Sequence, residues 1–386
     1  MIPFNKPFLV GKELYYVAQA VMGGHLSGNG SFTRKCHGWL NQRLGVRKSL
    51  LTHSCTGALE MAALLCELKP GDEVIMPSFT FVSTANAFAL FGAVPVFIDI
   101  RPDTLNVDEK LIEAAITDRT KAIVPVHYAG VPCEMGIIMD IARRHGLRVV
   151  EDAAQAMLST YDGRCLGSIG DMGCLSFHET KNIISGEGGA LLINDPALSE
   201  RAEILWEKGT NRSQFFRGEV DKYSWVDVGS SYLPSELMAA FLWAQLEEAD
   251  RIIEKRRRLF QSYMLGLSPL VRSGVLSVPF VSQGVSENGH LFYVLLKSGE
   301  ERDSLMGYLR ANGIYAVFHY VPLHSSPCGM RLGRSGSSMR WTDDLSERLL
   351  RLPLYYDMSQ EDQEFVISRV MAFFMEKSHT DVELDV

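Results

Sequence analysis

The sequence predicts an α/β protein with a large, mostly parallel β-sheet and a smaller C-terminal α+β domain. In the first two thirds of its 386 residues, short apolar runs rich in β-branched residues alternate with helical patterns. This alternation favours parallel strands joined by helices that cover both faces of one sheet. After Leu246 a long charged helix precedes a strand, a helix and a second strand, which favours a separate unit. Because this length suits about two or three domains, we expect domains at 1–250 and 251–386.

Local patterns predict the individual elements in chain order. Apolar runs predict strands at 48–54, 72–78, 94–100, 121–128, 146–153 and 172–178. Apolar residues at helical spacing predict helices at 56–68 and 84–92. In the C-terminal third, the pattern predicts a helix over 245–265, a strand over 290–298, a helix over 303–314 and a strand over 316–324.

Composition and charge exclude several classes of protein. The net charge of −8 argues against a nucleic-acid partner, since phosphate binding requires an excess of Lys and Arg. Seven cysteines without CxxC spacing indicate reduced thiols, and neither a disulfide framework nor a metal site. The N-terminus lacks the apolar core of a signal peptide, and the most apolar window, 79–98, is interrupted by polar residues. We therefore expect a cytoplasmic protein without a membrane span.

The first candidate site lies where the strand at 48–54 meets the following helix. Small residues from Ser54 to Gly57 occupy this junction, so the backbone N–H groups of Thr56 and Gly57 are placed to face an anion. The alternative is an ordinary strand-to-helix turn in which Thr56 caps the helix.

Asp152 is the second candidate. It follows a buried apolar strand in VVEDAAQA, and Gln155 lies one helical turn further on. A buried carboxylate needs a partner, because burying it unpaired is costly. A protonated heterocyclic nitrogen on a cofactor would supply that partner. The alternative is that Asp152 caps a following helix.

The third candidate is Lys181, in the stretch LSFHETKNIISGEGGALLI. The strand at 172–178 delivers Ser176 and His178 to the edge of the sheet, and Lys181 follows in a polar loop that ends in a glycine cluster. The alternatives are a solvated charge for Lys181, which is the usual fate of lysine, and a structural, hydrogen-bonded role for His178. Ligands of open α/β sheets bind beyond the carboxyl ends of the strands, where all three candidates lie.

Taken together, these sites match the needs of pyridoxal 5'-phosphate (PLP). The junction at Thr56 and Gly57 would hold the phosphate, Asp152 would keep the pyridine nitrogen protonated, and Lys181 would form a Schiff base with the aldehyde. Phe81, at the end of another predicted strand, supplies an aromatic cover for the ring. We expect no bound metal.

The motifs SCTGALE, PSFTFVSTANAF, PVHYAGVPCEM, VVEDAAQA, SFHETKNIISGEGG and HYVPLH occur in this order over nearly the whole chain. The series resembles that of the DegT/DnrJ/StrS family of sugar-nucleotide aminotransferases. The resemblance implies a fold-type I, aspartate-aminotransferase-like enzyme that uses PLP. It implies the following roles: Lys181 as the Schiff-base lysine, Asp152 as partner of the pyridinium, Gln155 near the ring hydroxyl, Phe81 stacked on the ring, and Thr56, Gly57 and Ser176 on the phosphate.

The resemblance also implies a homodimer whose active sites are shared between subunits. Segments 27–35 and 209–233 are the pieces expected at the shared site. Many relatives carry Asn at the position of Ser231, and that Asn reaches the partner's cofactor phosphate; here we expect the contact to pass through water, or to fall to Ser230 or Asn211. Many relatives also have small polar residues where Ile183 and Ile184 stand, so polar contacts from those two side chains are not expected.

Three residues of the smaller domain, His319, Tyr320 and His324, are expected to contact nucleotide or sugar. The alternative for them is packing of a strand end against the main domain.

Finer features at 209–233 and 239–252 resemble family members with a defined reaction. The resemblance implies ping-pong transfer of the amino group of L-glutamate to C4 of dTDP-4-dehydro-6-deoxy-D-glucose, with pyridoxamine phosphate as the intermediate form of the cofactor. The product would be dTDP-4-amino-4,6-dideoxy-D-galactose, used for enterobacterial common antigen, lipopolysaccharide or another glycan. The gluco epimer stays open, because residue spacing does not tell an axial C4 amine from an equatorial one.

Two other functions are less favoured by the residues. A PLP-dependent sugar dehydratase on the same scaffold would carry histidine in place of Lys181. A non-catalytic regulatory protein would not require Lys181, Asp152 and the phosphate cradle together.

Overall fold

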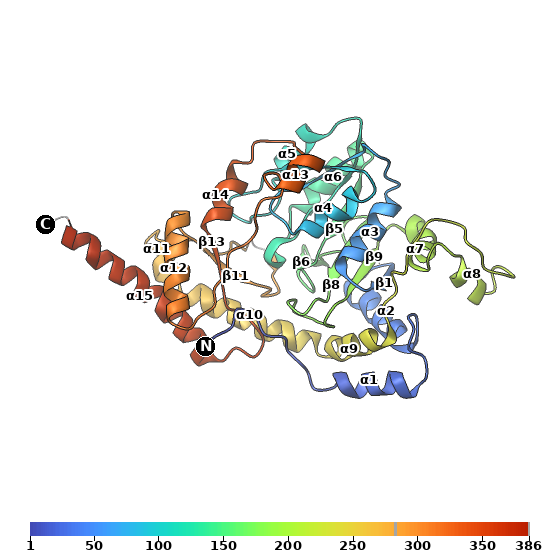
Figure 1. Ribbon diagram of the computed structural model, residues 1–386, viewed down its shortest axis with the longest axis horizontal. Helices are drawn as coiled ribbons and strands as arrows, with labels where there is room; N and C mark the ends of the chain where they lie inside the picture. The colour runs from blue at the N-terminus through green and yellow to red at the C-terminus, as the bar shows by residue number, and fades with distance from the viewer. Residues whose placement is uncertain (282–283, 385–386) are drawn as a thin grey trace.

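The computed structural model describes residues 1–281 and 284–384, and within them the largest sheet has eight strands (Figure 1). The strand order is β1-β9-β8-β5-β4-β2-β3-β12. The strands are β1 (Lys48–Thr52), β2 (Glu73–Pro77), β3 (Val94–Ile98), β4 (Thr120–Ile123), β5 (Arg148–Asp152), β8 (Met172–Ser176), β9 (Gly189–Ile193) and β12 (Arg334–Ser335). Only β9 runs antiparallel to its neighbours. The predicted mostly parallel sheet is confirmed, and so are the six strands expected in the first two thirds of the chain.

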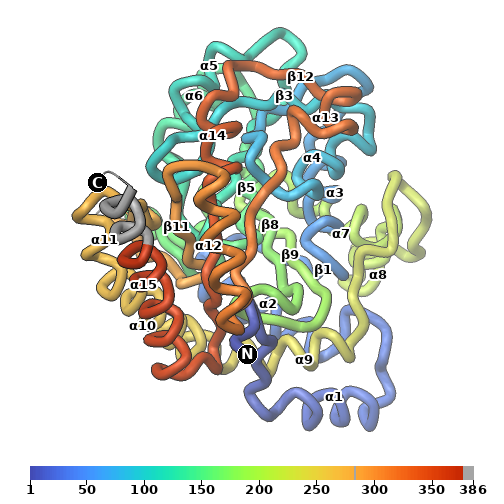
Figure 2. The backbone as a smooth tube through the Cα atoms, turned by 60° about the vertical axis from the view of Figure 1, so that its left-hand side comes forward, coloured from blue at the N-terminus to red at the C-terminus, as the bar shows by residue number. Residues whose placement is uncertain are grey.

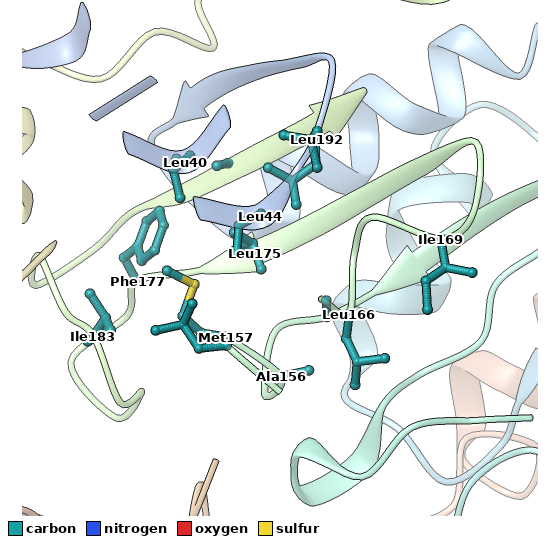
Figure 3. Packing of buried hydrophobic residues seen from close by; sticks show 14 of the residues in the cluster. Leu40, Leu44, Ala156, Met157, Leu166, Ile169, Leu175, Phe177, Ile183 and Leu192 are labelled. Carbon is teal, nitrogen blue, oxygen red and sulfur yellow. The ribbon is translucent and has the colours of Figure 1, made fainter. Parts of the chain in front are cut away.

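Helices cover both faces of this sheet, as predicted. One face carries α2 (Ser31–Leu44), α5 (Glu109–Ala115), α6 (Met135–His145) and α9 (Glu236–Glu247); the other carries α3 (Cys55–Leu65), α4 (Val82–Ala89) and α7 (Ser199–Trp206). Side chains alternate between the faces along each strand. For example, Figure 3 shows Leu175 and Leu192 in the same core as Leu40 and Leu44 of α2. The neighbouring residues Cys174 and Leu191 point to the opposite face of the sheet, into the core formed with α3, α4 and α7.

A second, smaller core lies beside the large sheet. It is built from α10 (Ala249–Gly266), α11 (Ser268–Arg272), β11 (Phe292–Leu295), α12 (Gly299–Ala311), β13 (Leu349–Leu352) and α15 (Gln360–Leu384). The strands β11 and β13 form an antiparallel pair. The expected strand at 290–298 and helix at 303–314 are confirmed. The helix expected over 245–265 is divided, because the backbone at Glu248 (φ −109°, ψ 11°) leaves the helical conformation between α9 and α10.

The strand predicted over 316–324 is wrong. Val317 makes a single antiparallel bridge with Arg351, and the described chain forms no strand between α12 and α13. The second strand of the small sheet is β13, which follows α14 (Arg340–Arg348) without any turn residue between them. In this segment the rings of His319 and Tyr320 pack against the ring of Tyr128, and these contacts take the place of strand pairing.

The C-terminal third also contributes to the large sheet (Figure 2). After α13 (Pro327–Leu332), the two residues of β12 pair in parallel with β3 at the sheet edge. Arg334 of β12 donates two hydrogen bonds of 2.9 and 2.7 Å to the fully buried carboxylate of Glu73 in β2. Residues after position 250 therefore contribute both to the large sheet and to the smaller core. The domain boundary between residues 250 and 251 stays a prediction.

Three further parts of the chain lie at the periphery. They are α1 (Glu13–Met22), α8 (Arg212–Phe216) and a three-stranded ribbon of β6 (Thr160–Tyr161), β7 (Arg164–Cys165) and β10 (Val285–Ser286). In Figure 1, α1 and the segment around α8 project away from the large sheet. Within the described residues, no helix combines the length and the apolar character needed to cross a membrane.

Glu236 joins two helices that are distant in sequence. Its buried carboxylate, at the start of α9, accepts hydrogen bonds from the backbone N–H groups of Gly30 (2.9 Å), Phe32 (2.8 Å) and Thr33 (3.0 Å), and one from the Thr33 hydroxyl. The N-cap of α2 is Gly30, which has no side chain to satisfy these groups. Glu236 therefore caps α2 and also places negative charge at its N-terminus, where the helix dipole favours it.

Substitution Glu236→Gln should lower the free energy of unfolding by about 2–3 kcal/mol, because an amide accepts these bonds without the charge and turns a donor toward N–H groups. Urea denaturation followed by circular dichroism measures this change. The control is Glu254→Gln, which removes an exposed pair with Arg258 and should cost under about 0.5 kcal/mol. Equal effects of the two substitutions would contradict the capping role.

Candidate active site

The carboxyl ends of β1, β2, β5 and β8 open into one cavity of about 830 Å³. Its opposite wall comes from residues 317–321 and Arg351, next to the small core. Eight of the predicted site residues line it: Thr56, Phe81, Asp152, Gln155, Ser176, Lys181, His319 and Tyr320. No group of potential metal ligands occurs among the residues that the structure describes.

Lys181 is held by a loop whose apolar residues are anchored in the core. Phe177, just after β8, and Ile183 are both fully buried in the cluster shown in Figure 3. Ile184 is also buried, at 3% exposure. The two isoleucines therefore fix the loop by packing, which agrees with the absence of polar contacts expected for them. The backbone closes the loop with bonds of 2.7 Å from Ser185 N to Phe177 O and 2.9 Å from Lys181 N to His178 O.

The Lys181 amine points into the cavity and makes no hydrogen bond or ion pair with any residue that the structure describes. Burial lowers the pKa of Lys181, while the neighbouring Cys55 and Asp152 act in the opposite direction. Burial raises the pKa of the Cys55 thiol, so Asp152 is the anion near the amine. Lys181 is partly exposed to the cavity and its pKa is lowered by burial, so these observations favour a site residue over a solvated loop charge.

Asp152 ends β5 with its carboxylate buried at the cavity wall. One oxygen accepts a 2.7 Å hydrogen bond from the Thr84 hydroxyl, and the other accepts a 3.1 Å bond from Ala154 N. The Thr84 hydroxyl also contacts the Thr80 hydroxyl at 2.8 Å, so the group is fixed in orientation. No helix follows Asp152 directly in the described chain, and the helix-capping alternative is therefore wrong.

Gln155 connects the two walls of the cavity. Its side-chain oxygen accepts a 2.7 Å hydrogen bond from Ala129 N, and its amide nitrogen donates a 2.9 Å bond to the Tyr320 hydroxyl. The ring of His319 lies 3.4 Å from that of Tyr320, and its Nδ1 is 2.9 Å from the Tyr128 hydroxyl. Burial lowers the pKa of His319, which keeps the imidazole neutral.

The start of α3 and the end of β8 form the hydroxyl-rich side of the cavity. Ser54 caps α3 by accepting a 3.1 Å hydrogen bond from Gly57 N, so Thr56 is not the cap and the Gly57 N–H is already bonded. Gly57 does not line the cavity. Thr56 donates to the Ser83 hydroxyl at 2.8 Å, and the Ser176 hydroxyl, at the end of β8, lies in the same wall.

Ser231 lies in a different cavity of about 790 Å³, lined by residues of both segments expected at the shared site and by neighbouring residues that include the carboxylates of Glu203 and Glu207. This second cavity also carries the basic side chains of Arg34, Lys208, Arg212 and Arg217. Two other expected substrate contacts are engaged locally and do not line it. Asn211 accepts a 2.7 Å hydrogen bond from Ser224 N, and Ser230 N donates to Leu205 O at 3.3 Å.

His324 is also outside the Lys181 cavity. Its Nδ1 lies 2.7 Å from the Ser78 hydroxyl, and its Nε2 lies 3.3 Å from an Asp343 carboxylate oxygen. These contacts favour the packing alternative for His324, whereas His319 and Tyr320 do line the cavity.

Three residues that were not predicted from the sequence also line the Lys181 cavity: Thr84, His290 and Arg351. Thr84 stands within the quoted motif PSFTFVSTANAF, and a hydroxyl two residues into a helix after a strand end was the available signal. Arg351 and His290 carry no local signal, because only tertiary packing brings the small core to the sheet edge.

The arrangement fits PLP, which needs an amine for its aldehyde, a buried carboxylate for its ring nitrogen and donors for its phosphate. Lys181, Asp152 and the hydroxyls of Thr56 and Ser176 face one cavity and meet these needs. Together with the mostly parallel sheet, they define a fold-type I PLP-dependent enzyme.

Comparison with known proteins identifies the family. The model of the DegT/DnrJ/EryC1/StrS aminotransferase family matches residues 9–371. The chain belongs to this family, whose enzymes are PLP-dependent sugar-nucleotide aminotransferases, and its cofactor is PLP.

Individual relatives are similar over most of their length. The pleiotropic regulatory protein of Geobacillus stearothermophilus is 34% identical over 319 residues, 82% of each chain. The spore coat polysaccharide biosynthesis protein SpsC of Bacillus subtilis (strain 168) is 33% identical over 377 residues, 96% of each chain. Among solved structures, the aminotransferase TlmJ from Streptoalloteichus hindustanus has a TM-score of 0.89 at 32% identity, covering 98% of this chain and 100% of its own. Such structures confirm the fold class.

The surroundings of the Lys181 amine predict how it titrates in the apoenzyme. Since burial lowers its pKa, the neutral amine should form at lower pH than on a free lysine side chain, and Asp152→Asn should move the transition lower still by removing a nearby negative charge. Competitive labelling with acetic anhydride across pH, read by mass spectrometry, follows the amine directly. The exposed Lys110 on α5 provides an internal reference for reagent reactivity. An upward shift in Asp152→Asn would contradict this description of the site.

Proposed function

We propose that this protein transfers the amino group of L-glutamate to C4 of dTDP-4-dehydro-6-deoxy-D-glucose and so acts as a dTDP-4-amino-4,6-dideoxygalactose transaminase. The observation that carries the catalytic part is the unpartnered Lys181 amine, in one cavity with the fixed carboxylate of Asp152. The sugar and its galacto configuration rest on the resemblance of 209–233 and 239–252 to such transaminases. The names of SpsC, a polysaccharide biosynthesis protein, and TlmJ, an aminotransferase, are in keeping with this function.

When bound, PLP supplies an aldehyde that condenses with amines and a protonated ring that withdraws electrons from the reacting carbon. Asp152 would hold that ring nitrogen protonated, and Thr84 would keep the carboxylate turned toward it. Thr56 and Ser176 would hold the phosphate through their hydroxyls and backbone N–H groups. Phe81, at the start of α4 and 57% exposed, is placed to cover the ring from the open side of the cavity.

Lys181 would hold the cofactor covalently in the resting enzyme and act as the base once an incoming amine has displaced it. Its Nζ would take the proton from the substrate carbon and return it to the cofactor. In the second half of the ping-pong cycle, with pyridoxamine phosphate, it would carry the proton in the reverse direction. A pKa lowered by burial suits this role, since the amine must be neutral to accept a proton.

The active site is proposed to be shared between two subunits. The second cavity brings together 27–35 and 209–233, with Ser231 and several basic side chains, but this surface does not line the Lys181 cavity of the same chain. Exposed apolar residues mark the same projecting segment, including Trp225 at 79% and Phe216 at 68% exposure. Large apolar side chains at this exposure favour burial against another protein surface. A second copy of the chain would cover them and add its basic groups to the phosphate side of the site.

The name of the Geobacillus relative describes regulation and not turnover. Lys181 and the hydrogen-bonded Asp152 are groups that a purely regulatory role would not need, so we retain the enzymatic proposal.

Incubation of the purified holoenzyme with L-glutamate and dTDP-4-dehydro-6-deoxy-D-glucose should release 2-oxoglutarate and an axial C4 amine, read by proton NMR. The variant Lys181→Ala should lose at least about 10³-fold in rate, because neither the covalent hold nor the base remains. Lys110→Ala is the matched control and should keep full activity. An equatorial amine would refute the galacto assignment, and undiminished release of 2-oxoglutarate by Lys181→Ala would refute the mechanism.

A heterodimer tests the shared site. One subunit carries Lys181→Ala and the other carries Arg212→Glu with Ser231→Glu, whose new negative charges should repel the partner's cofactor phosphate. Each homodimer should be inactive, whereas the heterodimer, purified through two different tags, regains one intact site and about half of the wild-type rate. Activity no higher than that of the two homodimers would show that each site is built from a single chain.

A further inference from the structure

Arg351 is a partly buried cation in the Lys181 cavity that makes no ion pair in the described chain. It belongs to β13, and its guanidinium carbon lies 4.7 Å from the centre of the Phe4 ring. Its Nη2 donates one 2.9 Å hydrogen bond, to Phe318 O, while its Nε is buried without any hydrogen-bond partner. Arg351 makes no ion pair with any residue that the structure describes.

The buried Arg256 shows what a purely structural guanidinium looks like in this protein. Arg256 donates to Gly289 O at 3.0 Å, His290 O at 2.7 Å and Leu354 O at 3.2 Å. Three carbonyl acceptors offset much of the cost of burying that group. Arg351 has one such acceptor, although a guanidinium carries five N–H donors. Its remaining donors are available to a ligand in the cavity.

The acidic residues of the cavity do not neutralise Arg351. Asp152 is bonded to Thr84 and Ala154, and Glu187 lies 3.5 Å from His178. Both belong to the sheet side of the cavity, whereas Arg351 belongs to the opposite wall with Phe318 and His319.

We propose that Arg351 binds a carboxylate of the amino-acid amino donor, an inference that rests on the proposed function. The planar guanidinium matches a carboxylate through two parallel hydrogen bonds. An amino acid that brings its amine to Lys181 must place its carboxylate in the same cavity, on a wall that is not occupied by the cofactor's phosphate side. The diphosphate of a sugar nucleotide has another set of cations available, Arg34, Lys208 and Arg212 of the second cavity.

The experiment measures the two half-reactions of the holoenzyme separately, together with the binding of glutarate, a dicarboxylate that has no amine. In Arg351→Gln, the affinity for glutarate (by calorimetry) and for glutamate (from the concentration dependence of the first half-reaction) should fall roughly 10- to 100-fold. Arg351→Lys keeps the positive charge but cannot form the two parallel hydrogen bonds, so its affinity for glutarate and glutamate should lie between those of Arg351→Gln and the wild type. The affinity of the pyridoxamine form for the sugar nucleotide should change by less than about threefold.

Arg348→Gln is the matched control. Arg348 also donates to a carbonyl, Leu296 O at 3.2 Å, but it pairs with Asp344 and does not line the Lys181 cavity. Its glutarate affinity should equal that of the wild type. If Arg351→Gln does not fold, Arg351→Lys decides the question, because losing the two parallel hydrogen bonds while keeping the charge must still weaken glutarate binding.

Unchanged glutarate and glutamate affinities in the Arg351 variants would overturn the proposal, and so would a wild-type enzyme that binds no glutarate. A selective loss of sugar-nucleotide affinity would overturn it in favour of a diphosphate contact. A wild-type enzyme that reacts with glutamate but not with the dTDP-sugar would refute the sugar assignment. The measurements of glutarate and glutamate affinity would still test the role of Arg351.

Discussion

The close approach of β9 to the start of α3 is the constraint on which the site depends. Gly189 opens β9 and pairs in register with Thr52 of β1 on one side and with Ser176 of β8 on the other. A side chain at this position would stand 2.5 Å from the backbone N of Cys55, so only glycine lets the helix begin there. The antiparallel β9 thereby sets the start of α3 beside the end of β8. The hydroxyls of Thr56 and Ser176 and the loop of Lys181 share one cavity because of this register.

A chain of buried amide contacts then ties Lys181 to the smaller core. Next to the lysine, Asn182 donates a 2.9 Å hydrogen bond to Asn288 O and accepts a 3.0 Å contact from His290 Nδ1. Asn288 in turn donates to Gln155 O at 2.9 Å. Buried polar networks of this kind are stable only when each member is satisfied. The position of Lys181 relative to Asp152 therefore depends on residues more than 100 positions later in the chain.

Periodicity was sufficient to predict the large sheet, because buried parallel strands such as β3 (VPVFI, 94–98) are continuous apolar runs. It failed for 316–324, where an apolar pattern serves aromatic packing around the cavity, and it missed β13, which follows α14 without a turn. The strand ends also predicted Lys181 and Asp152 as neighbours, since the carboxyl ends of parallel strands meet at one edge. Gly57 and His324 show the limit of this reasoning: hydrogen bonds to Ser54 and Ser78 turn both away from the cavity, and no local pattern reveals such contacts.

The distribution of charge explains how one cavity can orient a ligand that carries several charges. Hydroxyls and the start of α3 lie on the sheet side, where a phosphate finds donors and the positive end of a helix dipole. Asp152, at the end of β5, also belongs to the sheet side, and its negative charge disfavours a second anion beside it. Arg351 is the cation of the far wall, and the neutral His319 beside it adds no competing charge. With the roles proposed for Thr56, Ser176 and Arg351, a ligand with a phosphate at one end and a carboxylate at the other would satisfy both walls in only one direction, with its reacting centre at Lys181.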